Sequence, residues 1–292
     1  MERRNPLVTL TTDFGLADGY VGTMKGVILS IVPNARLVDL THEVTPQDVR
    51  RAAFVLYSAY PFFPPHTVHL AVVDPGVGSP RRPIALRTPT GTFVGPDNGI
   101  FTYVLAREPV EELVELSRPR FRLPEVSHTF HGRDVFAPAA AHLAAGIPLT
   151  ALGPSISNPV TFPLPHLEIG PDTIVGEVLH ADRFGNAITS IGRLTWAGEE
   201  LALEPAFQDA RCKKQEAGST GPTHFRASAA VVVVAGQEIA GIRRTYTEVA
   251  PGEVLALVGS HGHLEIAVRE GNAAARLGLR GGERVTLRFG TQ

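Results

Sequence analysis

Two aspartates stand where strand-like runs end, and each is followed two residues later by a glycine. Asp13 follows the run Leu7–Thr12, and Asp74 follows Val68–Val73 at the start of an Asp-Pro-Gly-Val-Gly turn. In an open parallel sheet, ligands bind beyond the carboxyl ends of the strands, so both carboxylates are candidates for a binding site. An aspartate before glycine or proline also commonly caps a turn. One aspartate alone fits either role, and the pair favours a site.

Two arginines and a histidine could complete such a site. Arg81 and Arg82 lie just past the glycine turn. A guanidinium there could neutralise a developing hydroxide or a substrate carboxylate, although both fit ordinary surface charge. His131 can exchange a proton near neutral pH, and the glycine after it permits close approach of a ligand. Asp134 is interpreted first as a helix cap or as the ion-pair partner of Arg133.

The second half of the chain carries a further polar group. Asp182, Phe184 and Asn186 surround a glycine, and their ring and amide suit stacking on, and hydrogen bonding to, a flat heterocycle. The same spacing is typical of a hairpin turn, which the spacing alone favours. Ser260 and Glu265 add polar groups on a later loop and strand. These residues indicate a small polar aromatic ligand.

The elements that must position these residues change along the chain. Alternating strands and helices predict a three-layer α/β domain over 1–165, with a mostly parallel sheet. A helix is expected from Thr45 as N-cap and Pro46 as first helical residue to Tyr60. Short apolar runs between turns predict a smaller antiparallel barrel or sandwich over 166–292. Further strands are expected at 84–87, 92–94, 174–179, 187–191, 230–234, 254–258, 264–268 and 285–289, and helices at 20–31, 101–106 and 137–145.

Composition excludes several classes of protein. The 292 residues carry 27 basic and 29 acidic side chains and one cysteine. This balance disfavours a nucleic-acid binder, and the lone Cys212 excludes an intramolecular disulfide.

No histidine pair has metal-ligand spacing, so no metal site is expected, and the phosphate-loop and dinucleotide motifs are missing. With no signal peptide and no apolar run long enough to span a bilayer, we expect a cytoplasmic protein without membrane contact. The polar stretch 208–222 is expected to form a surface loop.

Seven short motifs occur in order over nearly the whole chain. They are Thr12-Asp13-Phe14-Gly15, Asp39-Leu40-Thr41-His42, Val73-Asp74-Pro75-Gly76-Val77-Gly78, Gly95-Pro96-Asp97-Asn98-Gly99, Phe130-His131-Gly132-Arg133-Asp134, Asp182-Arg183-Phe184-Gly185-Asn186 and Leu264-Glu265-Ile266-Ala267. Together they resemble the S-adenosylmethionine hydroxide adenosyltransferase family, also called S-adenosylmethionine hydrolases. The resemblance implies an α/β domain, a carboxyl-terminal β-barrel, and a homotrimer with sites between subunits.

The resemblance also implies residue roles. An Asp/Arg/His triad that activates water would be Asp74, Arg81 and His131, with Arg82 as the alternative arginine. Asp74 and His131 are expected to position and deprotonate the water while Arg81 offsets negative charge. Substrate contacts would fall on Asp13 for the ribose hydroxyls, on Asp182, Phe184 and Asn186 for the methionine end and the adenine, and on Ser260, Glu265 and the backbone near Val268.

The implied reaction is attack of water at the ribose C5′ carbon of S-adenosylmethionine, giving adenosine and L-methionine without a cofactor. Related fluorinases and chlorinases carry Tyr-Ser where this chain has His131 and Gly132. The fluorinases also have an insertion in the region matching 74–95. Both differences favour the hydrolase. A halogenase and a non-enzymatic sensor of adenosine or S-adenosylmethionine remain the alternatives.

Overall fold

The chain divides into two compact units, residues 1–163 and 164–292. The computed structural model describes residues 5–207 and 223–290. The expected surface loop 208–222, with Cys212, lies outside the described residues.

The first unit is built on a six-stranded sheet in the order β2-β1-β3-β5-β4-β6. Strands β2, β1, β3 and β5 pair in parallel, whereas β4 is antiparallel to both of its neighbours, β5 and β6. The prediction of a mostly parallel sheet is therefore confirmed. Its strands are β1 (Leu7–Thr12), β2 (Arg36–Thr41), β3 (Val68–Val72), β4 (Pro83–Arg87), β5 (Thr92–Pro96) and β6 (Glu112–Glu115).

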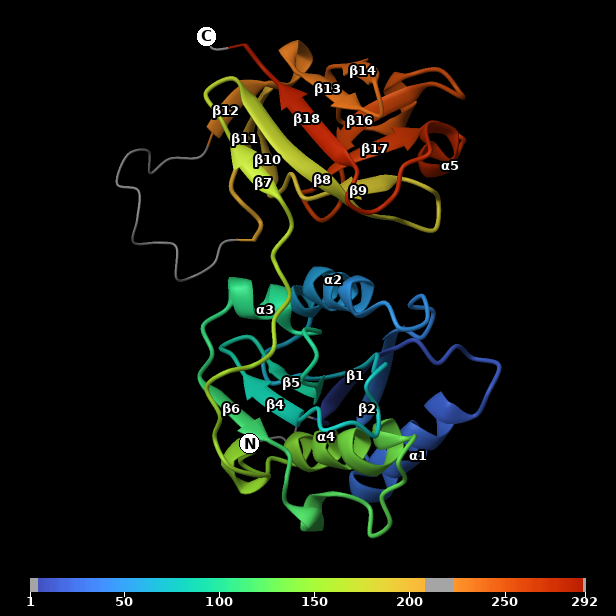
Figure 1. Cartoon of the computed structure of the whole chain (residues 1–292), viewed down its shortest axis with the longest axis vertical. Coiled ribbons are helices and arrows are strands. Elements are labelled where there is room, and N and C mark those ends of the chain that lie inside the picture. The colour runs from blue at the N-terminus through green and yellow to red at the C-terminus, as the bar shows by residue number, and fades with distance from the viewer. Residues whose placement is uncertain (1–4, 208–222, 291–292) are drawn as a thin grey trace. The chain divides into compact units, whose positions relative to one another are not determined.

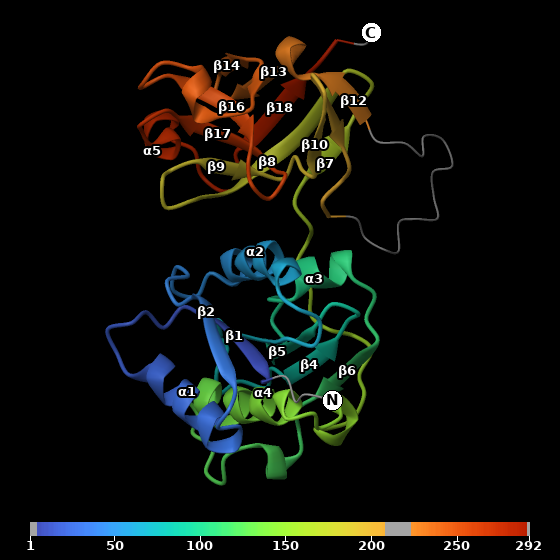
Figure 2. The ribbon, with the colours of Figure 1, turned by 180° about the vertical axis from the view of Figure 1, so that it is seen from behind.

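Helices cover both faces of this sheet and make three layers (Figure 1). Helices α2 (Val49–Ala59) and α3 (Thr102–Arg107) lie on one face, and α1 (Tyr20–Ile31) and α4 (Ala137–Ala144) on the other. Figure 2 shows the same layers from behind. Central strands covered on both faces are mostly apolar, and every residue of β3 and β5 is buried, including the polar His69 and Thr92. The α1 residues Met24 and Ile28, four positions apart, are fully buried in the same core.

The start of α2 differs from the sequence-based expectation. The helix begins at Val49, and its N-cap is Asp48, whose carboxylate accepts a hydrogen bond from the backbone N of Arg51 at 2.9 Å. Gln47 has φ of 68°, in the left-handed region, so a right-handed helix cannot run through it. Thr45 and Pro46 therefore belong to the preceding turn rather than to the helix.

The second unit is mostly β-structure. Nine strands form a barrel-like sheet in the order β14-β13-β18-β8-β9-β17-β16-β15, with β7 paired to β8, and β10, β11 and β12 form a smaller sheet. Side chains of both sheets, including Leu201, Val232 and Leu287, share one buried core. The strands are β7 (Leu167–Ile169), β8 (Thr173–Ala181), β9 (Ala187–Thr189), β10 (Leu194–Ala197), β11 (Glu200–Leu203), β12 (Thr223–Arg226), β13 (Val231–Val234), β14 (Gln237–Ala240), β15 (Ile242–Arg243), β16 (Val254–Val258), β17 (Leu264–Val268) and β18 (Arg284–Arg288).

Short helical segments complete the two units. Helix α5 spans Ala273–Leu277 and is capped by Asn272, whose side chain accepts from the backbone N of Ala275. A π-helical turn, Gly132–Phe136, leads directly into α4. Single 3₁₀ turns lie at Tyr60–Phe62, Pro119–Phe121, Leu149–Ala151, Ala227–Ala229 and Tyr246–Glu248.

Candidate functional site

An aspartate, an arginine and a histidine meet beyond the carboxyl end of β3. Arg81 Nε donates to Asp74 Oδ1 at 2.9 Å, and Arg81 Nη2 donates to Asp74 Oδ2. The same Nη2 lies 2.8 Å from Nδ1 of His131. The side chains of Arg81 and Asp74 are only 9% and 6% exposed, so this fork-shaped ion pair is largely shielded from water. The structure thus brings together the three residues proposed as the triad.

The neighbouring arginine points elsewhere. Arg82 Nε donates to Asp97 Oδ2 at 2.8 Å, and its Nη1 donates to Asn158 Oδ1 at 3.0 Å. Asp97 also accepts from the backbone N of Val160 at 2.7 Å, which ties the segment after α4 to the sheet. Of the two candidates, Arg81 therefore contacts both Asp74 and His131, and Arg82 is paired with Asp97.

Gly78, in the turn after β3, allows this turn to pack against the segment before His131. Gly78 has φ of 79°, and a Cβ there would lie 2.6 Å from the backbone O of His128. That close approach brings the segment before His131 against the Asp74 turn. Asn98, after β5, donates from Nδ2 to the backbone O of Val73 at 2.8 Å. The bond from Asn98 fixes Val73, the residue directly before Asp74 at the end of β3.

His131 stands at the entrance to the π-helical turn, a feature often found at functional sites. A Cβ on the next residue, Gly132, would approach Met24 Sδ to 3.2 Å and a ring carbon of Phe14 to 3.3 Å, so a glycine fits best here. Asp134 is fully buried, and it accepts from Arg133 Nε at 2.5 Å and from the backbone N of Ser127 at 2.8 Å. Asp134 is therefore structural, as the residue types suggested.

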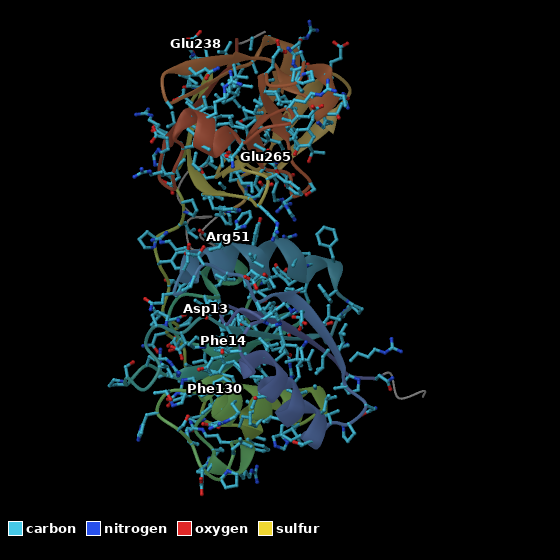
Figure 3. All side chains as sticks on the ribbon, turned by 90° about the vertical axis from the view of Figure 1, so that its right-hand side faces the viewer. Asp13, Phe14, Arg51, Phe130, Glu238 and Glu265 are labelled. Atoms are coloured by element: carbon cyan, nitrogen blue, oxygen red, sulfur yellow. The ribbon has the colours of Figure 1, made fainter. Side chains whose placement is uncertain are left out.

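A pocket of about 200 Å³ opens beside the triad. Asp74 and His131 supply its polar wall. Three aromatic rings contact one another around it, with centroids 5.8 Å apart for Phe14 and Tyr20, 5.9 Å for Phe14 and Phe130, and 5.1 Å for Tyr20 and Phe130. Figure 3 marks Phe14 and Phe130 in this unit. The pocket therefore joins an apolar wall, suited to a flat or sulfur-containing group, to a charged end.

The contact with Arg81 decides the protonation state of His131. A guanidinium has only donors, so Nδ1 of His131 must accept and the proton of the neutral ring sits on Nε2. Burial, and next the positive charge of Arg81, hold the pKa of His131 below its usual value. His131 is thus neutral at pH 7, and Nε2–H is its donor for a bound group.

Asp13 lies at the end of β1, next to the pocket residue Phe14 (Figure 3). Its Oδ2 accepts from the backbone N of Gln47 at 2.8 Å. That bond leaves Oδ1 as an acceptor for a ligand hydroxyl, since a carboxylate has about four acceptor positions. The structure therefore places Asp13 beside the pocket wall rather than inside the triad.

The second unit gathers its own polar cluster. Asp182 Oδ1 accepts from the backbone N of Phe184 at 2.8 Å and of Asn186 at 2.9 Å. Asn186 Nδ2 lies 3.1 Å from Asp182 Oδ2 and 3.3 Å from the hydroxyl of Tyr246, which in turn lies 3.5 Å from Glu265 Oε2. Burial, then the charge of Asp182, raises the pKa of Glu265 to about 7. Asp182, Asn186 and Glu265 are thus brought together, as the turn spacing alone did not require.

The remaining predicted contacts differ in environment. Phe184 is 75% exposed, which leaves its ring free to stack on a ligand. Ser260 is exposed, and its Oγ lies 3.4 Å from Nδ1 of His261. Val268 is buried in β17, and its backbone O accepts from the N of Gly271 at 3.1 Å. Ser260 and Val268 make none of the hydrogen bonds of the Asp182 cluster described above, whereas Phe184 joins it through its backbone N.

Sequence reasoning missed two groups of residues. Tyr246 was not singled out, although it connects Asn186 to Glu265, because it lies 60 positions from Asn186 and in no strand pattern. The aromatic wall was also missed. The one available indication of this wall was that Phe14, Tyr20 and Phe130 each carry an aromatic ring within a few residues of a candidate polar group.

Two searches over the described residues gave negative results. No group of three or more metal-ligating side chains was found there. No helix among 5–207 and 223–290 is both long and apolar enough to cross a membrane.

The protein thus combines an α/β domain, with a shielded Asp/Arg/His triad beyond the carboxyl end of β3, and a barrel-like domain with a polar cluster. The chain matches the models of both domains of one such family, the N-terminal domain over residues 8–153 and the C-terminal domain over 176–286. It belongs to the S-adenosylmethionine hydroxide adenosyltransferase family.

Individual relatives agree with this assignment. The chain is 40% identical over 288 residues to a protein of Salinispora tropica named (R)-S-adenosyl-L-methionine hydrolase, covering 98% of each chain. It is 31% identical over 220 residues to a fluorinase of Actinoplanes sp., covering 65% of this chain and 72% of that one. It is also similar to the crystal structure of an uncharacterized conserved protein from Thermotoga maritima, with 34% identity, a TM-score of 0.80, and coverage of 96% and 99%.

Proposed function

We propose that this protein hydrolyses S-adenosylmethionine to adenosine and L-methionine by attack of water at the ribose C5′ carbon. The observation that carries the proposal is the shielded Asp74–Arg81–His131 triad, of which Asp74 and His131 line a pocket that is aromatic on its other side. Membership of the family and the identity to the Salinispora tropica hydrolase support the same reaction.

The chemistry of the substrate sets what the site must do. A sulfonium leaves as a neutral thioether, so neither an acid nor a metal is needed behind it, and we propose that the reaction uses no cofactor. Bulk water has a pKa of about 15.7, so the demand falls on the nucleophile. Holding water in line with the breaking bond supplies about 7–11 kcal/mol, and a positioned base about 10²–10⁴ in rate.

We infer a division of these tasks that differs from the sequence-based expectation. His131 already accepts from Arg81 at Nδ1 and holds its proton on Nε2, so it is poorly placed to take a proton from water. We assign it the task of donating from Nε2–H to the attacking oxygen. Asp74 keeps unused acceptor positions beside those filled by Arg81, and it accepts the proton that the water loses. Arg81 offsets the negative charge that develops on the attacking oxygen as the proton leaves.

The second domain supplies groups suited to the rest of the substrate. Asp182 and Glu265 can attract the cationic ammonium of the methionine end, Asn186 can bind the adenine edge, and the exposed ring of Phe184 can stack. Ser260 and the backbone near Val268 are proposed as further contacts, and Asp13 as the acceptor for the ribose hydroxyls.

We further propose a cytoplasmic homotrimer in which the first domain of one subunit and the second domain of a neighbour complete each site. Light scattering should give three times the chain mass. Mixing an Asp74→Asn subunit with an Asn186→Ala subunit should restore part of the activity, because some sites in a mixed trimer then carry neither change.

The proposed function is tested by incubating the purified protein with S-adenosylmethionine and separating the products by chromatography. We expect adenosine and methionine in equal amounts. Asp74→Asn should lower kcat by about 10²–10⁴ while substrate affinity stays within about threefold, since the change removes the proton acceptor but keeps its shape. Binding without consumption would support a sensor instead, and an undiminished rate in Asp74→Asn would remove Asp74 from the mechanism.

A further inference from the structure

The Asp39-Leu40-Thr41-His42 motif has no part in the triad or the pocket lining, yet it contacts the loop that carries Asp13 and Phe14. His42 is 4% exposed and follows β2, whereas Thr12 is fully buried at the end of β1. Thr12 Oγ1 lies 2.8 Å from Nδ1 of His42. Nε2 of His42 lies 3.0 Å from Oδ1 of Asp39. We call Asp39, His42 and Thr12 the triplet.

The contacts of the triplet favour one direction for the hydrogen bond between Thr12 and His42, while His42 Nε2 and Asp39 are at ion-pair distance without a hydrogen bond. Thr12 Oγ1 accepts from the backbone N of Phe14 at 3.2 Å and has one proton to give. Donating it to His42 Nδ1 leaves the imidazole proton on Nε2, opposite the Asp39 carboxylate. The other tautomer would set a nitrogen lone pair against that carboxylate and deprive the hydroxyl of this acceptor.

The carboxylate end of the triplet is anchored at the surface. Lys25 Nζ donates to Asp39 Oδ2 at 2.6 Å. Burial opposes ionisation of Asp39, but the bond from Lys25 and the contact with His42 outweigh it, so its pKa lies below the usual range. The charge that orients His42 is therefore present at neutral pH.

His42 holds the Asp13–Phe14 loop at both ends. Its side chain orients the Thr12 hydroxyl that binds Phe14 N, and its backbone O accepts from the N of Gly15 at 2.8 Å. Gly15 has φ of 64°, so the backbone directly after Phe14 is in the left-handed region that favours glycine. Phe14 is a wall of the pocket, and Asp13 is the residue between the two anchor points.

We propose that the triplet is a positioning device that sets Asp13 and Phe14 for substrate binding. This inference rests on the proposed function for its substrate. Because the triplet acts through the binding wall and not through Asp74, Arg81 or His131, its loss weakens binding of the nucleoside part more than it slows the chemical step.

The test uses two matched threonines on the same strand. Thr12→Val removes the hydroxyl at nearly constant volume, and Thr12→Ser keeps it. Thr9→Val is the control for loss of a buried Thr–His bond, because Thr9 is also fully buried in β1 and its Oγ1 lies 2.8 Å from Nδ1 of His69. Steady-state kinetics with S-adenosylmethionine, and calorimetry with adenosine, are measured for each variant.

We expect Thr12→Val to raise KM and the adenosine Kd about tenfold with kcat changed less than about threefold. Thr12→Ser and Thr9→Val should stay within about twofold of the wild-type KM. An unchanged KM in Thr12→Val, or an equal rise in Thr9→Val, would overturn the proposal. Should Thr12→Val not fold, His42→Asn, whose amide can still accept from Thr12, must bind adenosine more tightly than His42→Leu, and equal affinities would overturn it.

The adenosine measurement separates this proposal from the proposed function. A wild-type protein that binds adenosine but leaves S-adenosylmethionine intact contradicts the hydrolase, and the adenosine Kd of the variants then decides the role of the triplet alone. A wild-type protein that neither binds adenosine nor consumes S-adenosylmethionine overturns both.

Discussion

Replacing His131 by glutamine and by asparagine tests which of its ring nitrogens the reaction needs. Glutamine can place an N–H near the position of Nε2, whereas asparagine reaches only the position of Nδ1. If His131 serves as a donor through Nε2–H, His131→Gln keeps the interaction that the reaction needs and His131→Asn loses it. If His131 is the base, both variants lose it equally.

The size of the effect follows from the contacts. A hydrogen bond to a charged group contributes about 1.5–3 kcal/mol, which corresponds to a factor of about 10–150 in rate. His131→Asn should therefore lower kcat by about that factor, and His131→Gln by less than about tenfold. The Arg81–Asp74 pair is formed by bonds that do not pass through His131, so it should remain in both variants.

The assay is the rate of methionine release at saturating S-adenosylmethionine between pH 5 and 9. In the wild type, activity should fall at low pH with a midpoint below 6.5, because burial and Arg81 lower the pKa of His131 and its protonated form would set an N–H against Arg81. His131→Gln should lack this limb. Equal losses above about 10³ in both variants, with rescue by added imidazole, would refute the donor role.

Three other predictions follow from the same contacts. Arg81→Lys should lower kcat about 10²-fold because lysine cannot bridge Asp74 and His131, whereas Arg82→Lys should change kcat less than about threefold and mainly lower Tm; the reverse result would exchange their roles. Because the pKa of Glu265 is raised to about 7, the folded protein loses stability as pH rises from about 4.5 through 7. The free energy of unfolding of Glu265→Gln, measured in urea, should therefore gain on the order of 2 kcal/mol relative to that of the wild type at pH 8. A difference between the two proteins that does not change with pH would contradict this. Chloride or fluoride should give no 5′-halogenated adenosine by mass spectrometry, and detection of one would move the chain to the halogenases.

Much of the first domain was predictable because its elements have strong local patterns. Buried runs such as β3 and the four-residue spacing of Met24 and Ile28 depend only on the nearby sequence. The start of α2 was not predictable from the local sequence, because the left-handed backbone at Gln47 is held by a hydrogen bond to Asp13, 34 positions away. Several short strands of the second domain, such as β7 and β15, also went unpredicted, since two or three residues carry too little pattern.

The candidate site divides in the same way. Residue types and glycine turns pointed to Asp74, Arg81 and His131, but the choice between Arg81 and Arg82 required the bonds to Asp74 and Asp97. The tautomer of His131 required its contact with Arg81. Tyr246 required the folded barrel, because it lies in a 3₁₀ turn and its partner Glu265 lies on β17, 19 positions away.

The origin of the oxygen in adenosine shows whether water attacks the ribose C5′ carbon. The reaction is run in water enriched in ¹⁸O, and the masses of the products are measured by mass spectrometry. We expect one labelled oxygen in adenosine, at the 5′ position, and none in methionine. Adenosine without label, or a label carried by methionine, would contradict attack by a water held between Asp74 and His131.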